Sequence, residues 1–352
     1  MLAYAFFFTV VCLGAAFSQK TTDKNSYITV SVLFLWLLIG LRDLSVGADT
    51  SGYIEEFGLI ARLDFAGMWV QTIEYKDPLY IIISWIISRI TTNYTIYLLV
   101  WAFFPAISLY VTFKREFKDS TECLVSILVF FLLGFFAFYV AGIRQTAALS
   151  IILLSWRSIQ EKKLIPFLIY VAIASLLHNS AVIFVVAFPL CFVRLRWWYI
   201  FIVAVLLYFL SFIALDNVFF LAQYFYGDRF DSYELGYEST QSSSALIMQI
   251  LLFVICIFKY KALINKDKVN SSLFIFAFIG ICFQSMAGML AEMSRISFYF
   301  CIFDLILVPR ALMEYGDKKT NPMIVFAFSA VSIIYLFFLT SANLPEYRFA
   351  FK

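Results

Sequence analysis

The chain has 352 residues, of which 63% are hydrophobic, 20% aromatic and only 14% charged. A soluble domain carries roughly 25% charged residues, and a water-soluble core of this size cannot hide the surplus apolar side chains, whereas lipid can cover them. The net charge is +3 and the basic residues cluster in short loops, which argues against nucleic acid as a partner.

The six cysteines and the single histidine limit the chemistry further. Every cysteine lies in or beside an apolar run and no Cys-X-X-Cys pair occurs, so we interpret the cysteines as small hydrophobic side chains. One histidine in the whole chain excludes a histidine-rich metal site. We therefore expect neither a metal nor a cofactor.

Apolar runs bounded by charged loops recur along the whole chain and predict an all-α, polytopic transmembrane bundle. The first run lacks a preceding basic segment, so we interpret it as a retained helix, not a signal peptide. The run 79–90, after Pro78, is shorter and is expected to be re-entrant or surface-lying. The remaining runs predict about 12 spans in one domain over residues 1–352, although many are shorter than the roughly 20 residues that cross the hydrocarbon core: 3–17, 27–41, 93–113, 124–140, 145–158, 164–177, 180–193, 197–214, 245–258, 272–290, 296–309 and 321–341.

Two long acidic loops interrupt the apolar pattern. The first, about 42–78, has a net charge of −4. Apolar residues between Ile54 and Trp69 recur in it with helical spacing, which predicts an amphipathic helix on the membrane surface. The second loop, about 215–244, is rich in Tyr, Gly and Ser.

The distribution of basic residues predicts the orientation. With the N-terminus outside, 17 of the 26 basic residues fall in cytoplasmic loops, and both acidic loops face outward. This scheme requires that 79–90 does not cross the bilayer.

Charged residues beside apolar runs are costly and mark candidate sites. In the outside-first scheme, four such polar runs fall on the outer face, namely Gly40–Tyr53, Gly142–Gln145, Leu177–Ser180 and Glu292–Arg295. Arg42, Arg144 and Arg295 would suit an anionic ligand, since guanidinium binds phosphate oxygens in pairs and stays charged. At helix ends, Arg42 and Arg295 are equally suited to reach lipid headgroups. Glu292 is a structural partner for Arg295.

Four further residues are candidates. Asp49 is suited to accept a proton from a sugar hydroxyl, or alternatively to form an Asx-turn or cap the next helix. His178 interrupts an apolar stretch and is suited to act as a base or to donate to phosphate, with a purely structural role as the alternative. Tyr53 is suited to stack on a sugar ring. Asp304 lies in an apolar run and needs a partner.

These polar runs resemble the motifs of EpsG-like proteins. The chain has Arg-Asp, Val-Gly-Ala-Asp-Thr and Tyr within Arg42–Tyr53, then Gly-Ile-Arg-Gln at Gly142–Gln145 and His-Asn-Ser-Ala at His178–Ala181, in the family's order. Gly47-Ala-Asp replaces the family's common Gly-Thr-Asp and keeps the acid. The resemblance extends over most of the chain, but only these stretches are specific.

EpsG-like proteins in turn resemble Wzy-type polymerases of exopolysaccharide, capsule and O-antigen. The resemblance implies a GT-C-like, metal-independent and inverting glycosyltransferase with a long first outer loop. Its substrates would be undecaprenyl-diphosphate-linked repeat units on the periplasmic or extracellular face of the bacterial plasma membrane. A flippase and a chain-length regulator of the same pathway are the expected partners, besides membrane lipid.

A diphosphate leaving group chiefly requires cations that hold its developing charge. On that basis Arg144 and Arg295, with Arg42, are expected to hold the diphosphate. Asp49 is the first choice for activating the acceptor hydroxyl and His178 the second. The resulting site has catalytic Asp49, His178 and Arg144 and substrate-binding Arg42, Tyr53, Gln145 and Arg295.

Three other functions remain open. A flippase of lipid-linked oligosaccharide would need charges at several depths, whereas here they gather at one face. A polysaccharide O-acyltransferase commonly uses a histidine to activate a hydroxyl, and His178 keeps that function possible. A GT-C enzyme that uses polyprenyl-monophosphate sugars differs mainly in its donor.

Overall fold

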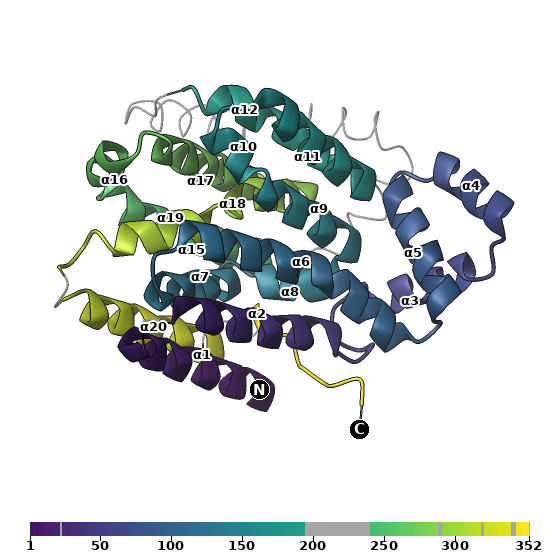
Figure 1. The fold of residues 1–352 in the computed structure, drawn as a ribbon, viewed down its shortest axis with the longest axis horizontal. Coiled ribbons are helices and arrows are strands. Elements are labelled where there is room, and N and C mark those ends of the chain that lie inside the picture. The colour runs from purple at the N-terminus through teal and green to yellow at the C-terminus, as the bar shows by residue number, and fades with distance from the viewer. Residues whose placement is uncertain (22, 194–239, 288–290, 318–319, 339–342, 352) are drawn as a thin grey trace.

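The computed structural model describes residues 1–21, 23–193, 240–287, 291–317, 320–338 and 343–351 (Figure 1). Every named element in these residues is a helix, and their only β-type pairing is an isolated antiparallel bridge between Arg42 and Phe349. The predicted all-α class is therefore confirmed. The predicted run 197–214 and most of the predicted loop 215–244 lie outside the described residues.

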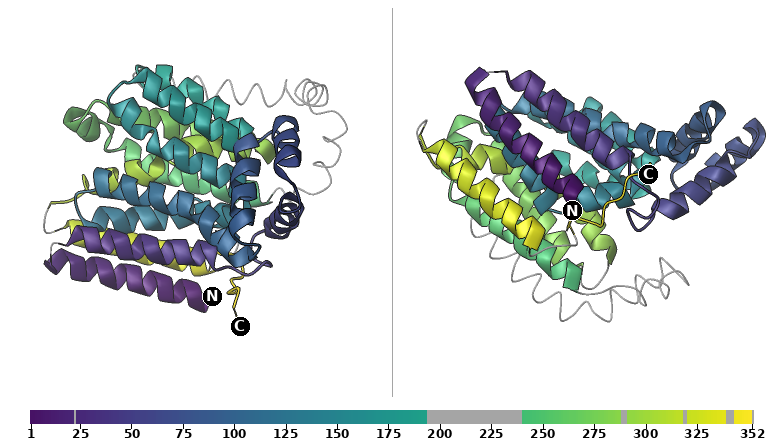
Figure 2. Two further views of the ribbon diagram at one scale, coloured as in Figure 1. Left: turned by 45° about the vertical axis from the view of Figure 1, so that its right-hand side comes forward. Right: turned by 90° about the horizontal axis from the view of Figure 1, so that it is seen from below.

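Most helices run side by side and form one bundle (Figures 1 and 2). α2 packs on α6, α6 on α9 and α9 on α11, while α7 contacts α1, α19 and α20. The bundle comprises α1 (Leu2–Thr21), α2 (Lys24–Gly40), α6 (Tyr94–Glu116), α7 (Ser120–Leu132), α8 (Phe135–Ala141), α9 (Ile143–Leu154), α10 (Trp156–Gln160), α11 (Leu164–Leu177), the 3-10 helix η1 (Asn179–Val186), α12 (Ala187–Leu190), α15 (Thr240–Ile257), α16 (Tyr260–Lys266), α17 (Asn270–Ser285), α18 (Ala291–Cys301), α19 (Asp304–Leu312) and α20 (Asn321–Phe338).

Several of these helices start at a residue whose side chain caps the first turn. Asp23 accepts a hydrogen bond from the backbone N–H of Ser26, and Asn93 and Asp119 likewise cap α6 and α7. These bonds satisfy donors at the first turn that have no partner within the helix. The capped helices then pack their apolar side chains into one continuous core.

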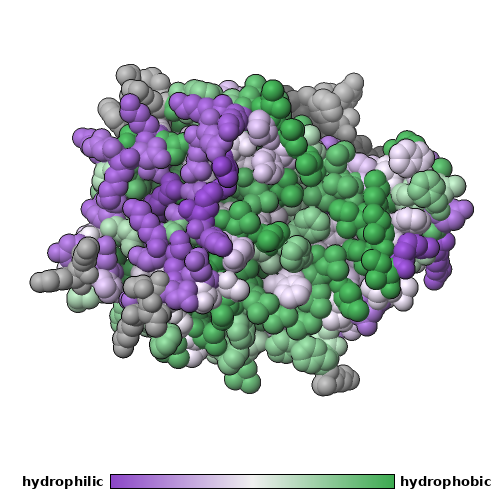
Figure 3. Space-filling model, viewed as in Figure 1, coloured by the Kyte–Doolittle hydropathy of each residue, from purple (hydrophilic) through white to green (hydrophobic). Residues whose placement is uncertain are grey.

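Three described helices, α1, α6 and α20, are long and apolar enough to cross a membrane, and the number rises to five if α7 with α8 and α15 with α16 each form one bent span. α2, α11 and α17 are shorter apolar helices. The structure thus supports a helical membrane protein, whereas about 12 spans is not confirmed. Figure 3 shows a broad apolar surface over the middle of the bundle, with hydrophilic side chains gathered at the left end and again beside α3–α5 (residues 50–90) at the right.

α3 (Thr50–Ile60), α4 (Phe65–Glu74) and α5 (Pro78–Ile90) lie across one end of the bundle (Figures 1 and 2). The single amphipathic helix expected between Ile54 and Trp69 is instead two helices. The break arises because the Asp64 carboxylate accepts from the Gly67 N–H at 2.7 Å and starts a new helix. α4 exposes Phe65, Trp69, Val70 and Ile73.

α5 begins with Pro78 at its first turn, packs on α3, α4 and α11, and runs crosswise to the bundle. The re-entrant or surface-lying placement expected for 79–90 stays a prediction. The loop and helices from Arg42 to Ile90 thus form a layer over one end.

A buried ion-pair network joins helices at the opposite end. Glu116 in α6 accepts from Arg310 in α19 at 2.6 Å, from Gln160 at 3.1 Å and from Trp156 at 3.3 Å. Arg310 also donates to Asn270 at the start of α17 (2.7 Å). The network therefore holds four helices together near the basic connections of the chain.

The loop after α2 packs tightly against α8 at Gly47. Gly47 has φ +92°, and a Cβ there would lie 2.1 Å from the Val140 carbonyl oxygen. Thr50 donates to that same carbonyl or to the Val46 carbonyl, at 3.0 and 2.7 Å. Only glycine permits both this backbone conformation and this close approach.

Gly47→Ala is expected to lower the stability of the protein. The unfavourable φ alone costs about 1–3 kcal/mol, and the contact with Val140 adds to it. We expect a lower thermal unfolding midpoint for the purified protein in detergent. Gly52→Ala is the control, since nothing lies within 4 Å of a Cβ at Gly52. Equal midpoints for Gly47→Ala and wild type would contradict this account of the loop.

Candidate functional site

Three helix ends meet at the end of the bundle covered by α3–α5. Asp77 immediately precedes α5, Arg144 lies in the first turn of α9, and His178 separates α11 from η1. The Asp77 side chain makes no capping bond to α5, so both carboxylate oxygens face other helices. Gly142 precedes α9 and ends α8, which places Arg144 at this end and not within the bundle.

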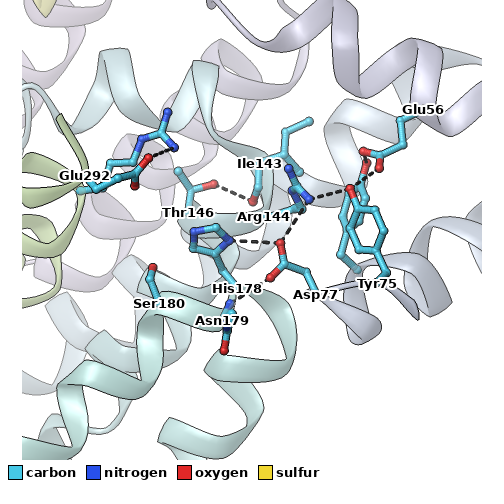
Figure 4. A network of polar contacts seen from close by, with 12 residues as sticks. Glu56, Tyr75, Asp77, Ile143, Arg144, Thr146, His178, Asn179, Ser180 and Glu292 are labelled. Atoms are coloured by element: carbon cyan, nitrogen blue, oxygen red, sulfur yellow. Dashed lines mark hydrogen bonds and ion pairs between the residues drawn. The ribbon is translucent and has the colours of Figure 1, made fainter. Parts of the chain in front are cut away.

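Asp77 is the centre of the polar network in Figure 4 and is 3% exposed. Its Oδ2 lies 3.2 Å from Arg144 Nη1 and 3.2 Å from His178 Nδ1, while its Oδ1 accepts from the Asn179 N–H at 2.9 Å. Burial raises the pKa of Asp77, but the hydrogen bonds and charges of His178, Asn179 and Arg144 outweigh it and hold the pKa below 3.8. The carboxylate is therefore ionised above that pH, and its ion pairs are lost only as the pH falls through the lowered pKa.

The ionised carboxylate fixes the tautomer of His178. Asp77 Oδ2 has no proton to donate, so His178 Nδ1 must donate to it. In the neutral imidazole the lone pair then lies on Nε2. The side chain of His178 is 23% exposed. This carboxylate–histidine pair is an arrangement suited to accept a proton from a hydroxyl.

Arg144 is held by aromatic rings as well as by Asp77. Its guanidinium carbon lies 5.4–5.5 Å from the ring centroids of Tyr53, Tyr75 and Tyr80, within the range of cation–π attraction. Nη1 also donates to the Tyr75 hydroxyl at 2.7 Å. The side chain remains 26% exposed, so the oriented positive charge is accessible to an anion.

Glu56 of α3 is hydrogen-bonded to two of the tyrosines that surround Arg144. It accepts hydrogen bonds from the hydroxyls of Tyr75 and Tyr80, the latter at 2.9 Å. Burial and the bond to Glu56 raise the pKa of Tyr75, so its phenol stays protonated. Figure 4 shows Glu56 and Tyr75 at one side of Arg144 and Asp77, with His178 on the other. The acidic segment 42–78 thus contributes directly to the network.

Arg295 and Gln145 join a neighbouring helix to this site. Gln145 is buried and donates from Nε2 to the Arg295 carbonyl at 2.9 Å, which ties α9 to α18. The Arg295 side chain is 43% exposed and lies 3.4 Å from Glu292. Ser180 and Tyr299 hydrogen-bond at 3.1 Å beneath them.

Contacts thus connect all four polar runs singled out in the sequence. Tyr53 packs on Arg144, Arg144 and His178 share Asp77, and Gln145 contacts Arg295. The common outer face predicted for these runs corresponds to one end of the structure.

Arg42 and Asp49 lie beside this network and make none of its polar contacts. Arg42 is 1% exposed and donates to the Ile39 carbonyl at 2.6 Å, and its backbone pairs with Phe349. It therefore fastens the loop after α2 to the C-terminal tail. Asp49 is exposed at the start of α3 and makes no capping bond.

Sequence reasoning missed Asp77, Tyr75 and Glu56. In the sequence, these residues stand out only as part of the acidic segment 42–78. The Asp77-Pro78 pair indicates only a helix start, because Asp before a helix is usually a cap, and nothing local shows that this carboxylate faces other helices. Its partner His178 is 101 residues away, which no local pattern reveals.

Comparison with known proteins identifies the family. The family comparison matches residues 3–350, nearly the whole chain, to the EpsG family. The chain belongs to the EpsG family. Searches of curated proteins and of solved structures found no match. The resemblance inferred from the polar runs is confirmed, and membership of the EpsG family indicates a polysaccharide polymerase type of function in a membrane protein.

Proposed function

We propose that this EpsG family member is a glycosyltransferase that polymerises undecaprenyl-diphosphate-linked repeat units into exopolysaccharide, capsule or O-antigen. The observation that carries the proposal is the Asp77–His178 pair beside Arg144, at one end of an apolar bundle. It combines a base for a hydroxyl with a fixed cation for a diphosphate.

The reaction is a single displacement at the anomeric carbon of the donor. The acceptor hydroxyl transfers its proton to His178 Nε2 as its oxygen attacks that carbon. The bond between the carbon and the diphosphate oxygen breaks, and the electron pair leaves with the diphosphate. Arg144 and Arg295 neutralise the charge that develops there. Attack opposite the leaving group inverts the anomeric configuration.

The structure favours His178 over Asp49 as the base. His178 has a carboxylate partner that orients it and supports its positive charge after proton transfer. Asp49 has no hydrogen-bonded partner among the described residues that would hold its carboxylate. Arg42 is left out of the diphosphate site because its side chain is buried and anchors backbone.

The active end is proposed to face the periplasm or the outside of the bacterial plasma membrane. The connections near the Glu116 network carry Lys114, Arg115, Lys266 and Lys268, whereas the site lies at the opposite end. Basic loops stay on the cytoplasmic side. The layer formed by α3–α5, with the apolar side chains exposed on α4, suits the outer membrane interface.

His178→Gln tests the base. Glutamine keeps a polar side chain of similar reach but cannot accept and carry the proton, so polymer formation is expected to fall by about 10²–10⁴-fold. The measurement is polymer chain length in a deletion strain complemented with the variant at wild-type membrane levels. The deletion strain itself is expected to accumulate single repeat units on the lipid carrier. Polymer of wild-type length with His178→Gln would rule out this residue as the base.

An O-acyltransferase is the second candidate, because the Asp77–His178 pair also suits hydroxyl activation in acyl transfer. Loss of an acyltransferase leaves chain length unchanged and removes acyl groups from the polymer. The same deletion strain therefore separates the two functions.

A further inference from the structure

A cavity lies beside the segments that carry the proposed site and plays no part in the chemistry described so far. Its volume is about 360 Å³, within the range of small-molecule sites. It is bounded by the loop at Gly47 and Ala48, by α7–α8, and by α15, α17, α18 and the C-terminal tail. All of its lining residues belong to the described part of the chain.

Uncharged polar groups and aromatic rings line this cavity. Gln249, Gln284, Ser294 and Asn343 contribute amides and a hydroxyl, and no ionisable side chain is among the lining residues. Phe138 and Phe298 stack on each other at its wall, with centroids 4.5 Å apart. Small residues such as Ala137 and Ala245 leave the space open.

Gln249 brings a buried, unpaired hydrogen-bond acceptor to the cavity wall. Its side chain is 3% exposed, and its Oε1 has no hydrogen-bond partner among the described residues. Within the described residues its Nε2 makes one bond, a long one of 3.4 Å, to Ser297 Oγ. A buried amide oxygen without a donor is costly, so a hydroxyl from a bound molecule would stabilise it.

The lining residues are close in sequence, on three segments, to the two arginines of the proposed site and to Asp49 beside it. Ala141 lines the cavity, and Arg144 follows three residues later. Ala48 precedes Asp49, and Ser294 precedes Arg295. The two arginines proposed to hold the diphosphate thus belong to the same segments of chain as the cavity wall, one at the start of α9 and one on α18.

We infer that the cavity binds a neutral sugar of the lipid-linked donor, the unit attached to the diphosphate. This inference rests on the proposed function and adds a sugar subsite to it. Amides and hydroxyls pair with sugar hydroxyls as both donors and acceptors, and the phenylalanine rings cover a C–H face. A uronic acid is disfavoured there, because no cationic side chain lines the cavity to pair with its carboxylate.

The test measures the affinity of the purified protein in lipid nanodiscs for two probes. One is undecaprenyl diphosphate without sugar, and the other is the sugar-bearing lipid extracted from the deletion strain. Ala245→Phe fills the cavity and is expected to weaken binding of the sugar-bearing lipid by about tenfold or more, with undecaprenyl diphosphate unchanged. Gln249→Leu keeps the volume, removes the amide and is expected to weaken the same probe about fivefold.

Val254→Phe is the matched control, since Val254 lies on the same helix, is 42% exposed and does not line the cavity. It is expected to bind both probes as wild type does. Wild-type affinity for the sugar-bearing lipid in Ala245→Phe and Gln249→Leu overturns the inference, as does loss of both probes together. If wild type binds neither probe, the proposed function itself fails.

Discussion

Asp77→Asn is expected to reduce polymer formation by about 10²–10⁴-fold while the protein still reaches the membrane. The asparagine Oδ1 can still accept from the Asn179 N–H, so its Nδ2 takes the place of Oδ2. An amide nitrogen only donates, and it then faces His178 Nδ1 and Arg144 Nη1. The imidazole is driven to the tautomer with its proton on Nε2, the atom that must accept one.

The measurement is the rate of polymer formation by membranes supplied with lipid-linked repeat units. Asp119→Asn is the matched control: Asp119 also precedes a helix, and it caps α7 through Thr121 and Glu122. Asparagine is an equally good cap, so this variant is expected to retain wild-type activity. Full activity of Asp77→Asn would show that the carboxylate does not orient the base.

Arg144→Lys is expected to have the second large effect, a loss of about 10²–10³-fold in polymerisation rate. Lysine keeps the positive charge beside Asp77, so the buried carboxylate retains a counter-ion and the fold is preserved. It cannot reproduce the planar guanidinium that packs among Tyr53, Tyr75 and Tyr80 and carries several N–H donors in one plane.

The same membrane assay measures this loss, with Arg157→Lys as the control. Arg157 is 65% exposed and pairs only with Glu161, away from the site. Its replacement is expected to leave activity unchanged, because an exposed i,i+4 ion pair contributes little to stability. If Arg144→Lys polymerises at the wild-type rate, a positive charge alone suffices and the tyrosine-held guanidinium has no specific role.

Much of the architecture could be predicted from composition and periodicity. An apolar, aromatic chain with short basic loops specifies a helical membrane bundle, and the structure confirms the all-α class. The four polar runs were also expected to share one face, and contacts now link them through Tyr53, Arg144 and Gln145. Their motifs resemble those of the EpsG family, to which the chain belongs.

The contacts that join the residues of the site could not be predicted from the sequence. Asp77 joins His178 across 101 residues and Arg144 across 67, and such distances depend on how α5, α9 and α11 pack. The sequence also does not show that the side chains of Arg42 and Gln145 donate to backbone carbonyls. Whether a polar side chain faces backbone or substrate depends on its burial in the folded protein. The break before α4 depended on the single cap at Asp64.

The most direct test of the central proposal is reconstitution. Purified protein in liposomes, given only undecaprenyl-diphosphate-linked repeat units, is predicted to form chains longer than one unit and to release one undecaprenyl diphosphate for each bond formed. The new linkage is predicted to have the anomeric configuration opposite to that of the donor. Repeat units that remain single in the presence of the folded wild-type protein, with no diphosphate lipid released, would contradict it.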